Sequence, residues 1–169
     1  IADVPAFIRL GGDLDRVTRE RGQTVYCPDL RVPLHPEVLS EGAGSLLPDA
    51  VRPAFVWDLR LDGAGVLVAA EVYRAMVRSV QRLDYDEVQG AIDDGTDDER
   101  LLMLREIGER RIAQERARGG ASLPMPEQEA GREDGHWALT SRRTLPVEGW
   151  NAQVSLLTGM AAASLMLDG

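Results

Sequence analysis

The sequence contains a single cysteine, Cys27, and no lysine. One cysteine excludes a disulfide within the chain and fits a reducing compartment, so we expect no disulfide partner and a cytoplasmic location. Aromatic residues make up only 5% of the chain, so its core must be mainly aliphatic. No apolar run approaches the roughly 20 residues that a membrane-spanning helix needs, so we expect no membrane contact.

Positive charge is also scarce. The 19 basic residues, all of them arginine, stand against 28 acidic residues, and the formal net charge is −9. Such a chain repels the phosphate backbone of nucleic acids unless its basic groups gather locally. The length of 169 residues and the hydrophobic fraction of 44% fit one folded domain and do not suggest disorder.

Both ends of the sequence interrupt predicted secondary structure. Residue 1 is isoleucine, and the first residues resemble the body of a strand. Residues 161–167 form an apolar helical run without a cap or tail. We therefore expect the sequence to be a piece of a longer protein.

Helices are predicted where a capping aspartate precedes, or a glycine follows, a run with helical character. One helix is expected to start after Asp13, one at Asp84 or Asp86, and a long one at Asp97 or Asp98. The predicted helices cover residues 14–21, 37–40, 84–93, 98–118 and 151–167, the last of them as a buried helix of small residues.

Strands are predicted where β-type residues lie between turn signals. The clearest pair flanks the turn at 62–65 and predicts a β-hairpin. The predicted strands cover residues 1–9, 23–27, 54–61, 66–80 and 137–145, with a polar loop around Pro124, Pro126 and Gly131. Irregular alternation of strands and helices indicates an α/β (α+β) fold in which a mixed β-sheet packs with helices.

Residues 93–99 form the densest acidic cluster, Asp-Asp-Gly-Thr-Asp-Asp-Glu. The spacing does not match the alternating ligands of a calcium loop, whereas helix capping explains it simply. Cys27, His35 and His136 fall short of a closed zinc site, and no motif makes a nucleophile–base pair of them. The arginines of 105–118 alternate with glutamates and indicate a solvated helix face, with nucleic-acid contact as the alternative.

Tyr26 and Tyr85 are lone aromatics in polar or turn-adjacent surroundings. An isolated tyrosine in such a place is usually a half-buried packing residue with a solvated hydroxyl. Exposed aromatic rings also serve as stacking platforms for unpaired bases. The residues alone leave these two roles open.

Segments in a fixed order carry a resemblance to a known family. They are IADVPAF at 1–7, LD and RGQTVY within 14–26, PLHPEVLS and SLLP within 33–48, RPA at 52–54 and LDYDEV at 83–88. Together they resemble the RNB-type catalytic domain of the ribonuclease II family of exoribonucleases. The resemblance spans nearly the whole chain, so residues 1–169 are expected to be a partial RNB-like catalytic domain.

The resemblance implies a function. Members of this family degrade single-stranded RNA from the 3′ end to nucleoside 5′-monophosphates with Mg²⁺ held by a cluster of aspartates. That motif precedes the segment that resembles residues 1–7, so no catalytic or metal-binding residue is expected in this chain, and the chain alone is expected to be inactive. The alternative is a non-catalytic RNB-like protein that binds RNA.

Four residues receive RNA-binding roles from the resemblance. Tyr26 matches a tyrosine that stacks on the RNA 3′ end, and Tyr85 one near the scissile nucleotide that helps distinguish RNA from DNA. The family's late helix carries a glutamate pair that is missing here, and Asn151 or Gln153 is expected to replace it as a neutral hydrogen-bonding group. A stacking phenylalanine is replaced at Leu123 or Pro124, which puts substrate preference in doubt.

Overall fold

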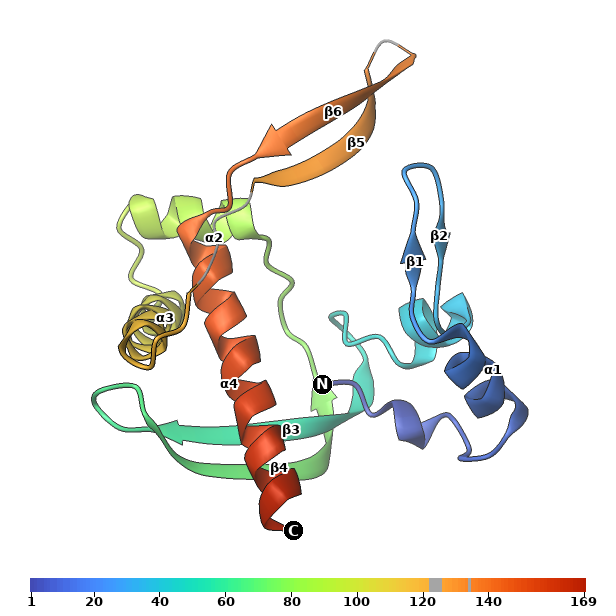
Figure 1. Cartoon of the computed structure of the whole chain (residues 1–169), viewed down its shortest axis with the longest axis horizontal. Helices are drawn as coiled ribbons and strands as arrows, with labels where there is room; N and C mark the ends of the chain where they lie inside the picture. The colour runs from blue at the N-terminus through green and yellow to red at the C-terminus, as the bar shows by residue number, and fades with distance from the viewer. Residues whose placement is uncertain (122–125, 134) are drawn as a thin grey trace. The chain divides into compact units, whose positions relative to one another are not determined.

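The computed structural model describes residues 1–121, 126–133 and 135–169 (Figure 1). Two compact units are present. The first consists of Ile1–Val56 and Val72–Arg82, and the second of Trp57–Glu71 and Leu83–Gly169. Leu123 and Pro124, the two positions at which the resemblance leads us to expect the loss of a stacking phenylalanine, lie outside the described residues.

Short elements build the first unit. These are a 3₁₀ turn at Val4–Ala6, α1 at Asp13–Arg21, β1 at Val25–Tyr26, β2 at Arg31–Val32 and a π-helical turn at Val38–Ala43. The helix predicted at 14–21 is confirmed, but its expected cap is wrong, because Asp13 is its first residue and Gly12 lies at the N-cap. The strand predicted at 23–27 is confirmed only at Val25 and Tyr26. The short helix predicted at 37–40 is present as the π-helical turn at Val38–Ala43.

The strand predicted at residues 1–9 is wrong beyond its first three residues. The backbones of Ile1 and Phe55 exchange hydrogen bonds of 2.8 and 2.9 Å, and the Asp3 amide donates to the Pro53 carbonyl at 3.1 Å. Pro5 then lies at the start of the 3₁₀ turn, since its ring fixes φ and removes the amide donor that a continuing strand would need.

The Asp3 side chain links the first three residues to Arg74, which lies on the long hairpin of residues 51–78 and belongs to the first unit. Its buried carboxylate accepts hydrogen bonds from Arg74, at 3.0 Å from Nε and 3.3 Å from Nη2. The same guanidinium lies 5.1 Å from the centre of the Phe55 ring, within the range of a cation–π contact. Asp3 is therefore paired and does not act as a free carboxylate.

The predicted β-hairpin is confirmed as β3, Val51–Leu61, and β4, Leu67–Arg78. The carboxylate of Asp62 accepts from the amides of Ala64 and Val66, both at 2.9 Å, and this closes the turn. Gly65 adopts a φ of 81°, and a Cβ atom there would lie 2.8 Å from Cβ of Arg110. The turn thus needs glycine both for its backbone and for its close approach to α3.

Three helices form most of the second unit: α2 at Tyr85–Asp93, α3 at Glu99–Ala117 and α4 at Pro146–Asp168. Asp84 caps α2 and Asp98 caps α3, so the capping interpretation of the acidic cluster is confirmed at Asp98. The Arg100 guanidinium, bonded to that carboxylate, lowers the pKa of Asp98 to about 2.

The core of the second unit lies where α4 passes α2 and α3 (Figure 1). Val88 and Ile92 of α2 pack against Val147 and Trp150 of α4, and partly buried aliphatic residues of α3 complete the cluster. The buried helix predicted at 151–167 exists but is buried on one side only, because its buried residues Gln153, Leu157 and Ala161 recur every four positions, and Met166 and Leu167 at its end are exposed.

A third hairpin leads into α4. It comprises β5, Glu127–Glu133, and β6, His136–Arg142, with Gly131 opposite Ala138. The polar loop predicted around Gly131 is therefore wrong at this residue, because pairing with β6 overrides the weak strand propensity of a polar segment. The strand predicted at 137–145 is confirmed as far as Arg142.

Helices and strands alternate irregularly along the chain, so the predicted α+β class is confirmed. Within the described part of the chain the strands pair only as hairpins, so the expected mixed sheet is divided into three two-stranded antiparallel sheets. Helix pairs, and not a continuous sheet, form the main packing of the second unit.

Gln89 joins α2 to the first turn of α4. Its Oε1 accepts from the amide of Val147 at 3.1 Å, and its Nε2 donates to Asp93 at 2.9 Å. Replacing Gln89 with leucine leaves the buried Val147 amide unpaired, which is expected to lower the free energy of unfolding by about 1–3 kcal/mol. Urea denaturation measures this change.

The matched control is Asp93→Asn, which keeps an oxygen acceptor for Gln89 at an exposed position. We expect it to change stability by less than about 0.5 kcal/mol. Equal stability of Gln89→Leu and the unmodified protein would show that this bond does not support α4.

Candidate functional site

Tyr26 projects from a short hairpin of the first unit. It ends β1 and pairs with Arg31 of β2, and the turn is closed by a 2.8 Å bond from the Cys27 amide to the Leu30 carbonyl. The Tyr26 side chain is 77% exposed, so it does not serve as a core residue. An exposed ring on a two-stranded support is able to stack on an unpaired base.

Tyr85 and Asn151 meet in the second unit, although 66 residues separate them. Tyr85 is the first residue of α2, directly after the cap Asp84, whose carboxylate accepts from the Glu87 amide at 2.8 Å. Asn151 lies in the second turn of α4, and its side-chain Nδ2 donates to the Tyr85 hydroxyl at 2.9 Å. Both side chains are exposed, so the pair offers a polar edge beside an aromatic ring.

Gln153 lies on a different side of α4 from Asn151. Successive residues of a helix are rotated by about 100°, so two positions separate these side chains by about 200°. Gln153 is only 4% exposed and donates to the Glu115 carboxylate of α3 at 2.5 Å. Its Oε1 is buried without a hydrogen-bond partner among the described residues.

Cys27 and His35 both belong to the first unit. Cys27 is exposed, and Nδ1 of His35 lies 3.3 Å from the Thr18 hydroxyl. Within residues 1–121, 126–133 and 135–169, no three His, Cys, Asp or Glu side chains gather closely enough to hold a metal ion. The described side chains of these four types therefore do not fit a magnesium site.

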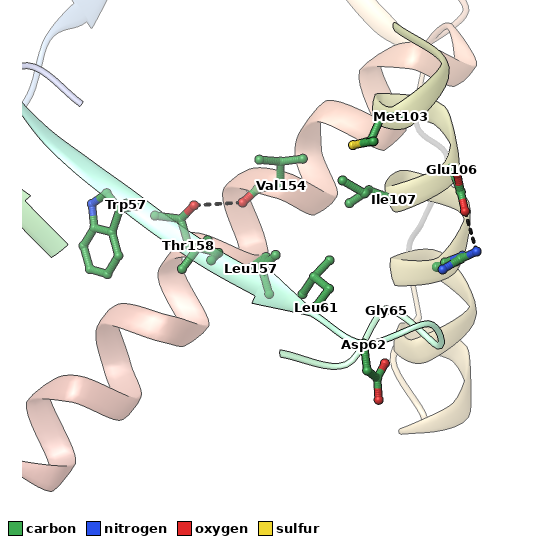
Figure 2. Close-up of a pocket in the computed structure, with 12 residues that line it drawn as sticks. Trp57, Leu61, Asp62, Gly65, Met103, Glu106, Ile107, Val154, Leu157 and Thr158 are labelled. Carbon is green, nitrogen blue, oxygen red and sulfur yellow. Dashed lines mark hydrogen bonds and ion pairs between the residues drawn. The ribbon is translucent and has the colours of Figure 1, made fainter. Parts of the chain in front are cut away.

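A cavity of about 470 Å³ lies in the second unit between β3, α3 and α4, and we call it the apolar pocket (Figure 2). Trp57 and Leu61 of the hairpin, Ile107 of α3 and Leu157 of α4 give it apolar walls. Two of its charged groups, Glu106 and Arg110, form an ion pair, and the third, Asp62, accepts hydrogen bonds from the backbone amides of Ala64 and Val66. None of the four predicted RNA-binding residues lines this pocket.

Most of the chain matches one known protein family. The family model for the RNB domain matches residues 1–146. The chain belongs to the RNB domain family, as the order of its sequence segments indicates.

Curated relatives are longer proteins. Ribonuclease R of Escherichia coli (strain K12) is 40% identical over 88 residues, which are 52% of this chain and 11% of the relative. Exoribonuclease 2 of Vibrio parahaemolyticus is 33% identical over 99 residues, 58% of this chain and 15% of the relative. The chain thus spans a small part of each.

Solved structures share the fold. Mycoplasma genitalium RNase R in complex with double-stranded RNA superposes with a TM-score of 0.81 at 21% identity, covering 91% of this chain and 29% of that one. Yeast Ssd1, described as a pseudonuclease, superposes with a TM-score of 0.62 at 22% identity, covering 74% and 16%. A nuclease and a pseudonuclease therefore share this architecture, so the fold by itself does not distinguish an active enzyme from an inactive one.

Among the described residues, no helix is both long enough and apolar enough to cross a membrane.

Proposed function

We propose that this chain is part of a 3′-to-5′ exoribonuclease that hydrolyses single-stranded RNA to nucleoside 5′-monophosphates. The observation that carries the proposal is the family match over residues 1–146, together with 40% identity to a segment of a ribonuclease R. Magnesium dependence belongs to the proposal, and the family resemblance assigns the metal ligands to an aspartate motif that residues 1–169 do not contain. The proposed compartment is the cytoplasm, in keeping with a single, exposed cysteine.

Within this proposal the chain supplies contacts to RNA. The exposed Tyr26 ring stacks on a base near the 3′ end, and the Tyr85–Asn151 pair lies beside the sugar of the scissile nucleotide. Gln153 is the alternative to Asn151 as the neutral group that replaces the family's acidic pair. Because Gln153 is buried against Glu115, its contact with RNA requires α3 and α4 to separate locally.

A second candidate function is RNA binding without hydrolysis. Two observations favour it: the matching fold of the pseudonuclease Ssd1, and the neutral Asn151 or Gln153 where the family's late helix carries glutamates. Both candidates predict RNA binding, so only hydrolysis separates them.

The test uses the full-length protein that contains this sequence, with 5′-labelled single-stranded RNA and Mg²⁺. On a denaturing gel we expect progressive shortening from the 3′ end, which stops when EDTA removes the metal, and much slower shortening of DNA of the same sequence. If the RNA is retarded in a native gel but stays intact, the proposal of a nuclease is wrong and the proposal of a non-catalytic RNA-binding protein takes its place. Neither binding nor shortening would reject both candidates.

A further inference from the structure

A second cavity of the second unit, of about 500 Å³, has a basic lining, and we call it the arginine pocket. It is formed by the start of β4, the end of α3 and the C-terminal half of α4. Its lining residues are Val66, Leu67, Arg111, Gln114, Ala117, Arg118, Leu157, Met160 and Ser164. No acidic side chain is found in this set.

Arg111 is a buried cation without a negatively charged partner among the described contacts. Its side chain is only 4% exposed. Nη1 donates to the Gly65 carbonyl at 2.9 Å, Nη2 approaches the Met160 sulfur at 3.5 Å, and Nε is buried without a partner. A buried charge that is bonded only to neutral groups is unfavourable, and a nearby anion would compensate it.

Arg118 adds a second positive charge to the same pocket. Burial, and then the charge of Arg118, lower the pKa of Arg111 below its usual value. Arg118 itself is exposed, so its guanidinium is accessible to a ligand. Two arginines at one cavity attract an anion more strongly than either of them alone.

Neighbouring acidic groups are engaged elsewhere. Glu115, one turn after Arg111, accepts a hydrogen bond from Gln153, and it does not line the pocket. In the apolar pocket, by contrast, Arg110 is neutralised by Glu106. The arginine pocket therefore differs from its neighbour in retaining positive charge.

We propose that the arginine pocket binds a phosphate group. The forked guanidinium of Arg118 matches the geometry of phosphate oxygens, Ser164 offers a hydroxyl donor, and Arg111 contributes positive charge. Gln114 is less available as a donor to phosphate, because its side-chain Nε2 already donates to the Ala64 carbonyl at 3.0 Å. The pocket falls within the 300–1,000 Å³ typical of small-ligand sites, and its apolar walls leave space for the rest of a nucleotide.

Isothermal titration calorimetry of the full-length protein without Mg²⁺ tests the proposal, with inorganic phosphate, adenosine monophosphate and adenosine as probes. We expect phosphate and the nucleotide to bind, and adenosine to bind at least about tenfold more weakly than the nucleotide. Comparable binding of phosphate and nucleotide would identify free phosphate as a sufficient ligand. Tighter binding of the nucleotide would add recognition of the nucleoside.

Arg118→Ser is expected to weaken phosphate binding about tenfold, as the loss of a charge-assisted hydrogen bond does. Arg116→Ser is the matched control, since it removes the same charge from an exposed position of α3 that does not line the pocket. Absence of phosphate binding, equal losses in the two variants, or an unchanged Arg118→Ser protein would overturn the proposal. Binding is measured without hydrolysis, so the outcome is independent of nuclease activity.

Discussion

The Gly108→Ala protein is expected to be about 2–4 kcal/mol less stable than the unmodified protein, since overpacking a dense contact forces the backbone to move. Gly108 lies on α3 and faces Trp150 of α4. A Cβ atom at this position would lie 2.6 Å from Cα of Trp150 and would also overlap Cβ and Cγ of the same residue. Because one of these atoms belongs to the backbone, a change of rotamer at Trp150 does not relieve the overlap.

Gly159→Ala is the matched control for this prediction. Gly159 is also helical, lies on α4, and has open space around the position of an added Cβ. Alanine there should raise stability by about 0.5–1 kcal/mol, because it restricts the unfolded chain and favours the helix. Urea unfolding of both variants measures the difference, and a Gly108→Ala protein as stable as Gly159→Ala would contradict the close crossing of α3 and α4.

Tyr26→Ala is expected to weaken binding of short single-stranded RNA by about 5-fold to 150-fold, the range that corresponds to the 1–3 kcal/mol of one stacked base. In the full-length protein the final product of degradation should also become longer, because a short RNA dissociates earlier when its 3′ end loses a stacking partner. Fluorescence anisotropy measures the affinity, and a sequencing gel measures the product.

Two controls separate stacking from other effects. Tyr26→Phe keeps the ring and should behave like the unmodified protein. Tyr73→Ala removes another exposed tyrosine of the first unit, 46% exposed on β4, which the family resemblance does not match to RNA. Unchanged product length in Tyr26→Ala, or the same loss in Tyr73→Ala, would reject the stacking role.

Local signals predicted much of the fold. The aspartates that cap α2 and α3, the glycine that ends α1, and the Asp-Gly-Ala-Gly turn of the long hairpin act within a few residues, so the sequence reveals them directly. The sequence does not predict β5, because its polar residues carry no alternating pattern and it forms only by pairing with β6. The apolar pattern of residues 1–9 predicts a strand, but Pro5 overrides this pattern and starts a 3₁₀ turn.

In the candidate site, too, features set by neighbouring residues follow from the sequence, whereas features set by helix packing do not. Exposure of Tyr26 agrees with its polar, turn-adjacent setting, which the sequence shows. The contact between Asn151 and Tyr85 depends on how α4 packs on α2, and no local pattern encodes it. Nor does the sequence alone show that Gln153 faces Glu115 while Asn151 faces solvent, because that requires knowing which side of α4 meets α3. The sequence does not predict the arginine pocket for the same reason: the alternating charges of 105–118 indicate one solvated face, whereas Arg111 is buried against α4.

The bond between Gln89 and Val147 also bears on the order in which the chain folds. It joins residues 58 positions apart, and it satisfies one of the amides that the first turn of α4 cannot pair by itself. The start of α4 is therefore completed by a side chain that leaves the ribosome earlier. Closing a loop of this length costs conformational entropy, and this cost slows the formation of the contact. We therefore expect α4 to become protected from hydrogen exchange only after α2 has formed.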